Sequence, residues 1–184
     1  MMKRVIRWLA LAGASSLCAA CGGSLFESKI PAPDRYVIAA APAAAAATQS
    51  AALQADLSIG RPDVAPGLDT DRIAVLRGRR LEYFRGAQWG GPVAEIVQAL
   101  LVASFEGQRV FHSVIPEQAR VSGDYLLDVE VRAFQAEYAS EDSAPQVQVT
   151  IVGRVIRITD RQLVDTLQAT ASRRSHTGVT STTT

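Results

Sequence analysis

The chain has almost no cysteine. Its two cysteines, Cys18 and Cys21, both fall within the first 21 of 184 residues, and none follows them. The rest of the chain therefore has no internal disulfide and no thiolate metal site. The 164 residues from Cys21 onward are enough for one domain, whose stability must come from packing.

Residues typical of catalytic centres are also scarce. Of the two histidines, His112 lies in a short expected strand and His176 in a polar tail, and neither has a metal-ligating partner at helical or hairpin spacing. Serine-hydrolase elbow and phosphate-loop motifs are missing. The acidic pairs Asp69/Asp71 and Glu141/Asp142 lie in turn segments, where solvated carboxylates are expected. We therefore expect no enzyme: no catalytic residue, no cofactor and no metal site.

Long apolar runs are missing as well. The longest, residues 8–20, follows three basic residues and is shorter than the roughly 20 residues that span a bilayer. A basic start, a short apolar stretch and small residues at its end are typical of an export signal. Removing Lys3, Arg4 and Arg7 from the 19 basic residues leaves 16 against 18 acidic ones. That balance argues against general nucleic-acid binding.

A cysteine stands directly after the signal. With Ala19-Ala20 before Cys21, the segment resembles a bacterial lipoprotein signal, which implies cleavage between Ala20 and Cys21 and acylation of the Cys21 thiol. Cys18 occupies the place where such signals usually carry leucine, and an ordinary secretory signal is the alternative. Gly22 follows instead of aspartate, which in lipoproteins of this kind implies sorting to the outer membrane.

The first half of the chain after the signal predicts a tether and several short strands. We expect a lipidated tether over 21–34, one domain over 35–171 and an alanine-rich insertion over 39–52. Strands are expected at 36–38 and 53–59, followed by a hairpin at 73–76 and 81–84. A basic cluster surrounds the hairpin turn, either as a solvated turn or as a contact for anionic headgroups or an acidic partner; it comprises Arg77, Arg79, Arg80 and Arg85.

One helix is clearly indicated. Pro92 suits its first turn, and Gly107 suits its C-terminal cap. Apolar residues recur at three- and four-residue spacing and form a single stripe, which favours packing on a sheet; they are Val93, Ile96, Val97, Leu100, Leu101 and Phe105. The preceding Gly90-Gly91 lets the chain turn, with a weak anion site at the helix start as the alternative.

Alternation of period two follows the helix. After a brief strand at 110–114, the run 125–138 changes phase between Ala133 and Phe134, which predicts a β-bulge. The return run slips after Gly153, and a last strand covers 163–171 before a disordered polar tail, 172–184. These features predict an α/β fold, with α+β possible: a mixed, largely antiparallel sheet with one main amphipathic helix packed on a face.

The order of these elements resembles the ABC-type transport auxiliary lipoprotein family, the PqiC-like lipoproteins. In that family the segment before the helix commonly reads Trp-Ala-x-Pro-Leu, and here it is Trp89-Gly90-Gly91-Pro92-Val93. The resemblance covers roughly 34–171 and implies an anticodon-binding-domain-like fold. Family members generally continue into a further amphipathic helix, whereas this chain ends in polar residues, so that helix is either missing or lost through an altered reading frame.

The resemblance also implies a function and partners. We expect a non-enzymatic lipoprotein on the periplasmic face of the outer membrane that works with an MCE-domain protein and with an ABC permease and ATPase in lipid transport. Alternatives are a periplasmic carrier with an internal lipid cavity and a general envelope-integrity lipoprotein. A homo-oligomer is possible, because long strands supply edges for association.

Overall fold

The computed structural model describes residues 31–40, 53–140 and 143–174. Several predicted features lie outside these residues: the signal, Ala20, Cys21, Gly22, nearly all of the tether, most of the alanine-rich insertion, Glu141/Asp142 and His176. The described residues from Pro33 to Arg174 belong to one compact unit. Its strands are β1 (Asp34–Tyr36), β2 (Leu53–Ile59), β3 (Asp63–Val64), β4 (Arg72–Arg77), β5 (Arg80–Trp89), β6 (Phe111–Pro116), β7 (Tyr125–Tyr138), β8 (Gln146–Arg157) and β9 (Gln162–Arg174).

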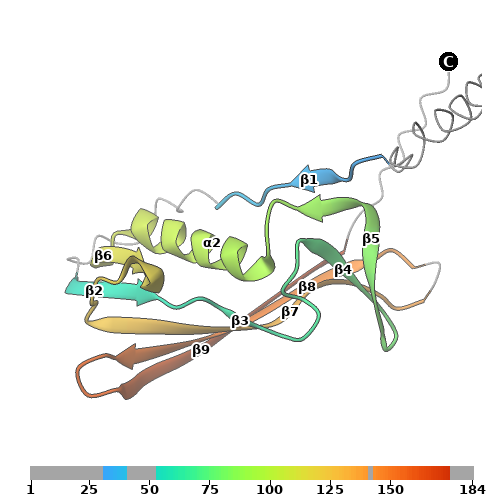
Figure 1. Cartoon of the computed structure of the whole chain (residues 1–184). Coiled ribbons are helices and arrows are strands. Elements are labelled where there is room, and N and C mark those ends of the chain that lie inside the picture. Colours follow the sequence, from blue (N-terminus) through green and yellow to red (C-terminus); the bar gives the residue numbers. More distant parts are fainter. Residues whose placement is uncertain (1–30, 41–52, 141–142, 175–184) are drawn as a thin grey trace, which may run out of the picture. The chain divides into compact units, whose positions relative to one another are not determined.

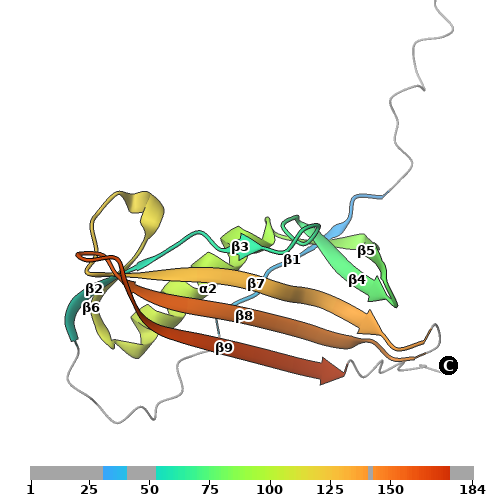
Figure 2. The same cartoon turned by 90° about the horizontal axis from the view of Figure 1, so that it is seen from below.

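All nine strands belong to one mixed sheet, and β7 is its central strand. Along one side of β7, the strands β2, β3 and β4 pair in parallel with its start, middle and end. Along the other side, β8 pairs antiparallel over nearly the whole length of β7, and β9 pairs antiparallel with β8 (Figure 2). The predicted mixed sheet is confirmed, and its longest pairings are the antiparallel ones.

The remaining strands extend the two ends of the sheet. At one end β6 joins β2 in parallel; at the other, β5 forms the predicted hairpin with β4, and β1 pairs in parallel with β5. A short 3₁₀ turn, η1 (Glu117–Ala119), follows β6. The hairpin strands are longer than predicted, since β5 continues from the turn to Trp89.

One helix, α2 (Val93–Gln108), lies across one face of the sheet (Figure 1). Its first turns pack on Val131 and Phe134, and its later turns pack near Leu127 and Val129, so α2 runs opposite to β7. Most of the predicted stripe therefore faces the sheet, through Val93, Val97, Leu101 and Phe105. Ile96 is the exception, because it lines a hollow on the outer flank of α2. No helix among the described residues is long and apolar enough to cross a membrane.

The helix end was predicted wrongly. Gly107 lies inside α2, and Arg109 is the residue with left-handed backbone (φ 54°), its N–H bonding to the carbonyl of Glu106 at 3.2 Å. The next carbonyl, that of Val110, accepts a hydrogen bond from the N–H of Leu53 at 2.8 Å. Pairing with β2 therefore determines where the chain leaves the helix, two residues beyond the glycine.

The bulge predicted in β7 is confirmed. Val131 pairs with Ile151 and Ala133 with Thr150, so Arg132 is the extra residue. The slip predicted after Gly153 is wrong, because the register of β8 on β7 continues unbroken there. Gly153 belongs to the inward row, and a Cβ at this position would lie 3.1 Å from Cδ1 of Leu127. A register shift does occur two residues later, between Val155 and Ile156, but against β9.

Two further boundaries differ from the prediction. β1 lies earlier than expected and ends at Tyr36, where its carbonyl accepts a hydrogen bond from the N–H of Gly90 at 2.9 Å. β9 continues to Arg174, beyond the predicted start of the polar tail at Ser172, because its pairing with β8 lasts up to Gln146. Polar composition thus does not end a strand whose backbone is still paired.

Candidate functional site

An apolar pocket of about 370 Å³ lies between α2 and the sheet. Its walls come from five parts of the chain: α2, the β4–β5 hairpin, β7, β8 and Ile38, which follows β1. The lining residues are Ile38, Ile73, Ala74, Trp89, Val97, Leu100, Leu101, Ser104, Phe134, Gln135, Ala136, Val147, Val149 and Ile151.

The bulge in β7 is what brings the aromatic wall into this pocket. Before the bulge, Val129 and Val131 point to the helix side; one extra residue keeps Phe134 on the same side despite the odd spacing. The ring of Phe134 then meets the indole of Trp89 edge to face, with centroids 5.7 Å apart and planes at 66°. Without Arg132 as an extra residue, Phe134 would belong to the opposite face.

The pocket is apolar in chemistry as well as in shape. None of the described residues that line it is charged. The hydroxyl of Ser104 donates to the carbonyl of Leu100 at 2.7 Å, and the side chain of Gln135 accepts from the N–H of Phe134 and donates to Glu137. The indole Nε1 of Trp89 is different: it is buried and has no hydrogen-bond partner among the described residues.

The start of α2 is closed by a carboxylate of the chain itself. Oδ1 of Asp69 accepts a hydrogen bond from the N–H of Ala94 at 3.1 Å, and Oδ2 accepts from Arg61 at 3.1 Å. Asp69 therefore occupies the position that an external anion would take at a helix N-terminus. Pro92 lies just before the first helical residue and accepts hydrogen bonds from the N–H groups of Glu95 and Ile96.

The basic cluster at the β4–β5 turn is partly neutralised. Arg77 lies 3.6 Å from Glu82 and stacks over the ring of Tyr138 at 3.8 Å. Arg80 lies 3.5 Å from the same carboxylate. Two of the four arginines thus have contacts within the hairpin or with β7, as expected for a solvated turn.

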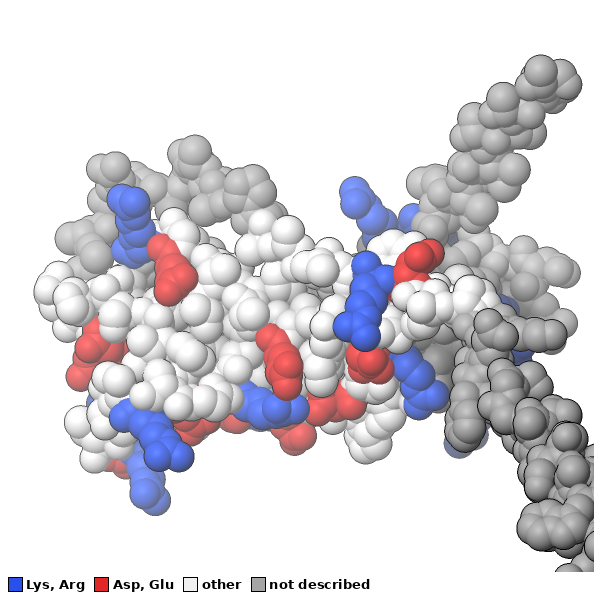
Figure 3. Space-filling view, turned by 45° about the horizontal axis from the view of Figure 1, so that its top comes forward, with Lys and Arg blue, Asp and Glu red and all other residues white. Residues whose placement is uncertain are grey.

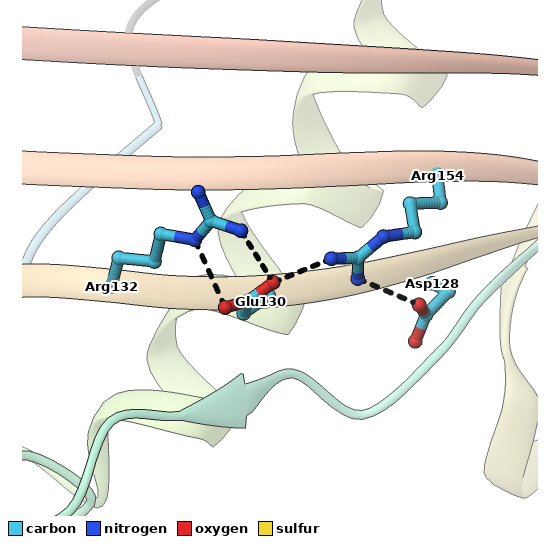
Figure 4. A network of polar contacts seen from close by, with 4 residues as sticks. All are labelled: Asp128, Glu130, Arg132 and Arg154. Atoms are coloured by element: carbon cyan, nitrogen blue, oxygen red, sulfur yellow. Dashed lines mark hydrogen bonds and ion pairs between the residues drawn. The ribbon is translucent and has the colours of Figure 1, made fainter.

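The face of the sheet opposite α2 carries a charge network (Figure 4). Glu130 accepts hydrogen bonds from Arg132 at 2.9 Å and from Arg154 at 2.6 Å, and Arg154 also reaches Asp128 at 3.2 Å. The bonds from Arg132 and then Arg154 lower the pKa of Glu130 to about 2. On the helix side, in contrast, charged side chains of both signs are scattered among uncharged residues (Figure 3).

His112 belongs to a polar cluster that joins β2 to β6. Its Nδ1 lies 2.9 Å from Oδ1 of Asp56, which also accepts a hydrogen bond from the hydroxyl of Ser113 at 2.7 Å. These bonds, that of Ser113 foremost, lower the pKa of Asp56. Among the described residues, no group of three or more potential ligands is placed to hold a metal ion.

The two residues of the family-like motif lie in different places: Trp89 lines the pocket, and Pro92 lies at the start of α2. The strand residues that form the other walls of the pocket could not be predicted to lie together. Ile38, Ile73, Phe134 and Val149 are far apart in the chain, and each was an ordinary apolar strand residue by pattern. The strand order of the sheet brings them together, and the sequence pattern does not reveal that order.

The fold and this site define an α/β domain with one helix on a mixed sheet and an apolar pocket between them. A family model described as the ABC-type transport auxiliary lipoprotein component matches residues 36–182. The chain therefore belongs to the ABC-type transport auxiliary lipoprotein family, as its sequence predicted.

Two solved structures share this fold. Protein XCC0632 from Xanthomonas campestris is 24% identical, with a TM-score of 0.62, and the match covers 81% of this chain and 80% of that one. A second, uncharacterized protein is 13% identical, with a TM-score of 0.56 and coverage of 78% and 81%. The PelC dodecamer from Paraburkholderia phytofirmans is a more distant match, 12% identical with a TM-score of 0.46 and coverage of 69% and 77%. A comparison with curated proteins found no match.

Proposed function

We propose that this protein is a lipid-anchored, non-enzymatic subunit of an ABC-type transport system that moves lipids between the membranes of the cell envelope. The observation that carries the proposal is the family match, which covers the described domain from Tyr36, the last residue of β1, onward. Its direct partner would be an MCE-domain protein, and that protein would link it to the permease and ATPase.

The anchor is the second part of the proposal. Cleavage after Ala20 and acylation of Cys21 would attach the chain to a membrane, and Gly22 would direct it to the outer one. The described domain begins 13 residues after Cys21, at β1. A segment of that length reaches about 40 Å when extended, which is enough to hold the domain away from the membrane surface on the periplasmic side.

The surface best suited to a protein partner is β9. This strand has 13 residues, all of them exposed, and among the described residues it pairs with β8 alone. Leu163, Val164 and Leu167 are large apolar residues on it that lie open. A free, partly apolar edge of this length supports strand addition by a partner or by a second copy.

The proposal is tested by site-specific photo-cross-linking in cells. A photoreactive residue replaces Leu167 on β9 in one variant and Glu106, on the exposed side of α2, in the control variant. We expect Leu167 to cross-link to the MCE-domain protein, and Glu106 to do so weakly or not at all. Cross-links from both positions to unrelated envelope proteins, with no transport subunit among them, would refute the assignment.

The anchor is tested separately by membrane fractionation. Wild type should sediment with the outer membrane, Gly22→Asp should shift to the inner membrane, and Cys21→Ser should lose the acyl anchor and no longer reach the outer membrane. Palmitate labelling that is equal in wild type and Cys21→Ser would show that Cys21 is not the acylated residue.

A further inference from the structure

We propose that the pocket beneath α2 binds one hydrocarbon chain of a lipid, and that Trp89 contacts this chain. The proposal gives a ligand class to a site on the chain itself, and it does not depend on the transport partners. Two observations carry it: the lining of the pocket and its size.

The lining determines the class of ligand. The described residues around the pocket are aliphatic or aromatic apart from Ser104 and Gln135, and both of these already make hydrogen bonds within the chain. With no charged side chain in the lining, the pocket offers nothing to a sugar, nucleotide or peptide backbone. An apolar chain, in contrast, gains from leaving water and loses no hydrogen bond on entry.

The size of the pocket fits a chain. Apolar cavities of about 150 Å³ already stay dry and take up small hydrocarbons. The pocket here, at about 370 Å³, is more than twice that size and falls within the range of pockets that hold small ligands. Water within it would find almost no partners, so an apolar occupant displaces solvent at little cost.

A second apolar hollow on the other flank of α2 is the main competitor. It is lined by residues after β1 and by the outer flank of α2, and it shares Ile38 and Leu100 with the first pocket. Adjacent helix residues separate the two sites: Ser104 lines the pocket beneath α2, and Ala103 lines the second hollow. Enlarging one residue or the other therefore blocks one site and leaves the other open.

The chain carries its own reporter for the experiment. It has two tryptophans, Trp8 and Trp89, so Trp8→Phe leaves Trp89 as the sole fluorophore. Cys21→Ser removes the acylated thiol, which excludes the protein's own anchor as the occupant. The purified double variant is titrated with dibromostearate, whose bromine atoms quench tryptophan on contact, at concentrations below those at which the probe forms micelles.

We expect saturable quenching with one probe molecule per chain. Ser104→Phe should weaken binding by about tenfold or more, while Ala103→Phe should leave it unchanged. Trp89→Phe, studied by native mass spectrometry of the bound probe, should retain binding, because an aromatic ring still lines the pocket. Thermal unfolding checks that each variant is folded, and Ser104→Met replaces Ser104→Phe if the larger residue is not tolerated.

Three outcomes would overturn the proposal. They are linear, non-saturating quenching, equal binding by the Ser104 and Ala103 variants, and loss of binding in the Ala103 variant alone, which would assign the chain to the second hollow. None of these outcomes bears on docking to the transport partners, because no partner is present in the experiment.

Discussion

Two strands of the same sheet, β7 and β9, differ sharply in what covers them. They have nearly equal lengths, 14 and 13 residues, and run parallel to each other with β8 between them. In β7 the inward residues Leu127, Val129 and Val131 are buried under α2. In β9 every residue is exposed, although Leu167 and Ala169 lie on the same cross-strand rows as Val129 and Val131.

The difference shows that neighbours, rather than the residues of a strand, decide its burial. α2 covers β7 and leaves β9 open, and β9 has a paired strand on one side only among the described residues. Alternation in a sequence therefore indicates which residues share a face, and says nothing about whether that face is covered.

The largest expected effect comes from placing a charge at either of two positions on one cross-strand row, one of them buried and the other exposed. Val131→Asp puts a carboxylate at a fully buried position between α2 and the sheet, where it has no partner. We expect it to lower the free energy of unfolding by more than about 4 kcal/mol, enough to prevent folding in practice. Urea unfolding followed by circular dichroism measures the loss.

Ala169→Asp is the matched control, because Ala169 lies across Ile151 from Val131 on the same row. Its exposed carboxylate should cost less than about 1 kcal/mol. A large loss from both substitutions would mean that β9 is as well covered as β7.

Much of the local structure of β7 and of the helix that covers it could be predicted from the sequence. The alternation over 125–138, a bulge in this strand and the helix that starts after Pro92 were all predicted and are confirmed; the bulge was expected between Ala133 and Phe134 and lies at Arg132. These features are local, because a strand period, a one-residue phase change and a proline each act within a few residues. The end of α2 was missed because a distant pairing, Leu53 with Val110, overrides the nearby Gly107.

The candidate pocket could not be predicted from the sequence for the same reason: it depends on contacts between distant segments. Trp89 was a candidate residue only because it belongs to a family-like motif. Its partner Phe134 and the wall residue Ile38 come from other parts of the chain, and the parallel pairing of β4 with β7 brings the walls together. Parallel pairings between short strands leave no local sequence signal.

The next effect in size concerns the helix that produces the difference between β7 and β9. Asp69→Ala removes the acceptor for the N–H of Ala94 at the start of α2, and we expect a loss of about 1–2 kcal/mol in the free energy of unfolding. Asp71→Ala is the control: among the described residues its carboxylate accepts a side-chain hydrogen bond only from Thr70, at 3.4 Å, so the loss should stay within about 0.5 kcal/mol. Equal losses, measured by urea unfolding, would show that Asp69 does not hold the helix start.

A smaller, pH-dependent effect is expected on the face opposite the helix. The pKa of Glu130 is lowered from its ordinary value of 4.5 to about 2 by Arg132 and Arg154, so the folded state releases this proton more readily than the unfolded state does. Its contribution to stability is full above the ordinary value and is lost as the pH falls from 4.5 toward 2. The difference in urea midpoint between wild type and Glu130→Gln should therefore be largest at neutral pH and vanish in acid. Glu106→Gln, on the exposed side of α2, controls for the loss of one carboxylate, and a difference that is constant with pH would contradict the prediction.

The smallest expected effect tests the open strand directly. Leu167 lies on one row with Val129 across Gly153, yet it is 58% exposed where Val129 is 1% exposed. Val129→Thr buries a hydroxyl in the core and should cost about 1–3 kcal/mol. Leu167→Thr loses little contact and keeps a residue that favours strands, so the free energy of unfolding should change by no more than about 0.5 kcal/mol. Urea unfolding is measured for both variants at two protein concentrations. Leu167→Thr could instead prove as costly as Val129→Thr, with a larger cost at the higher protein concentration. That result would mean that a second copy of the chain covers β9 in solution. The difference in burial between the two strands would then hold only for the monomer.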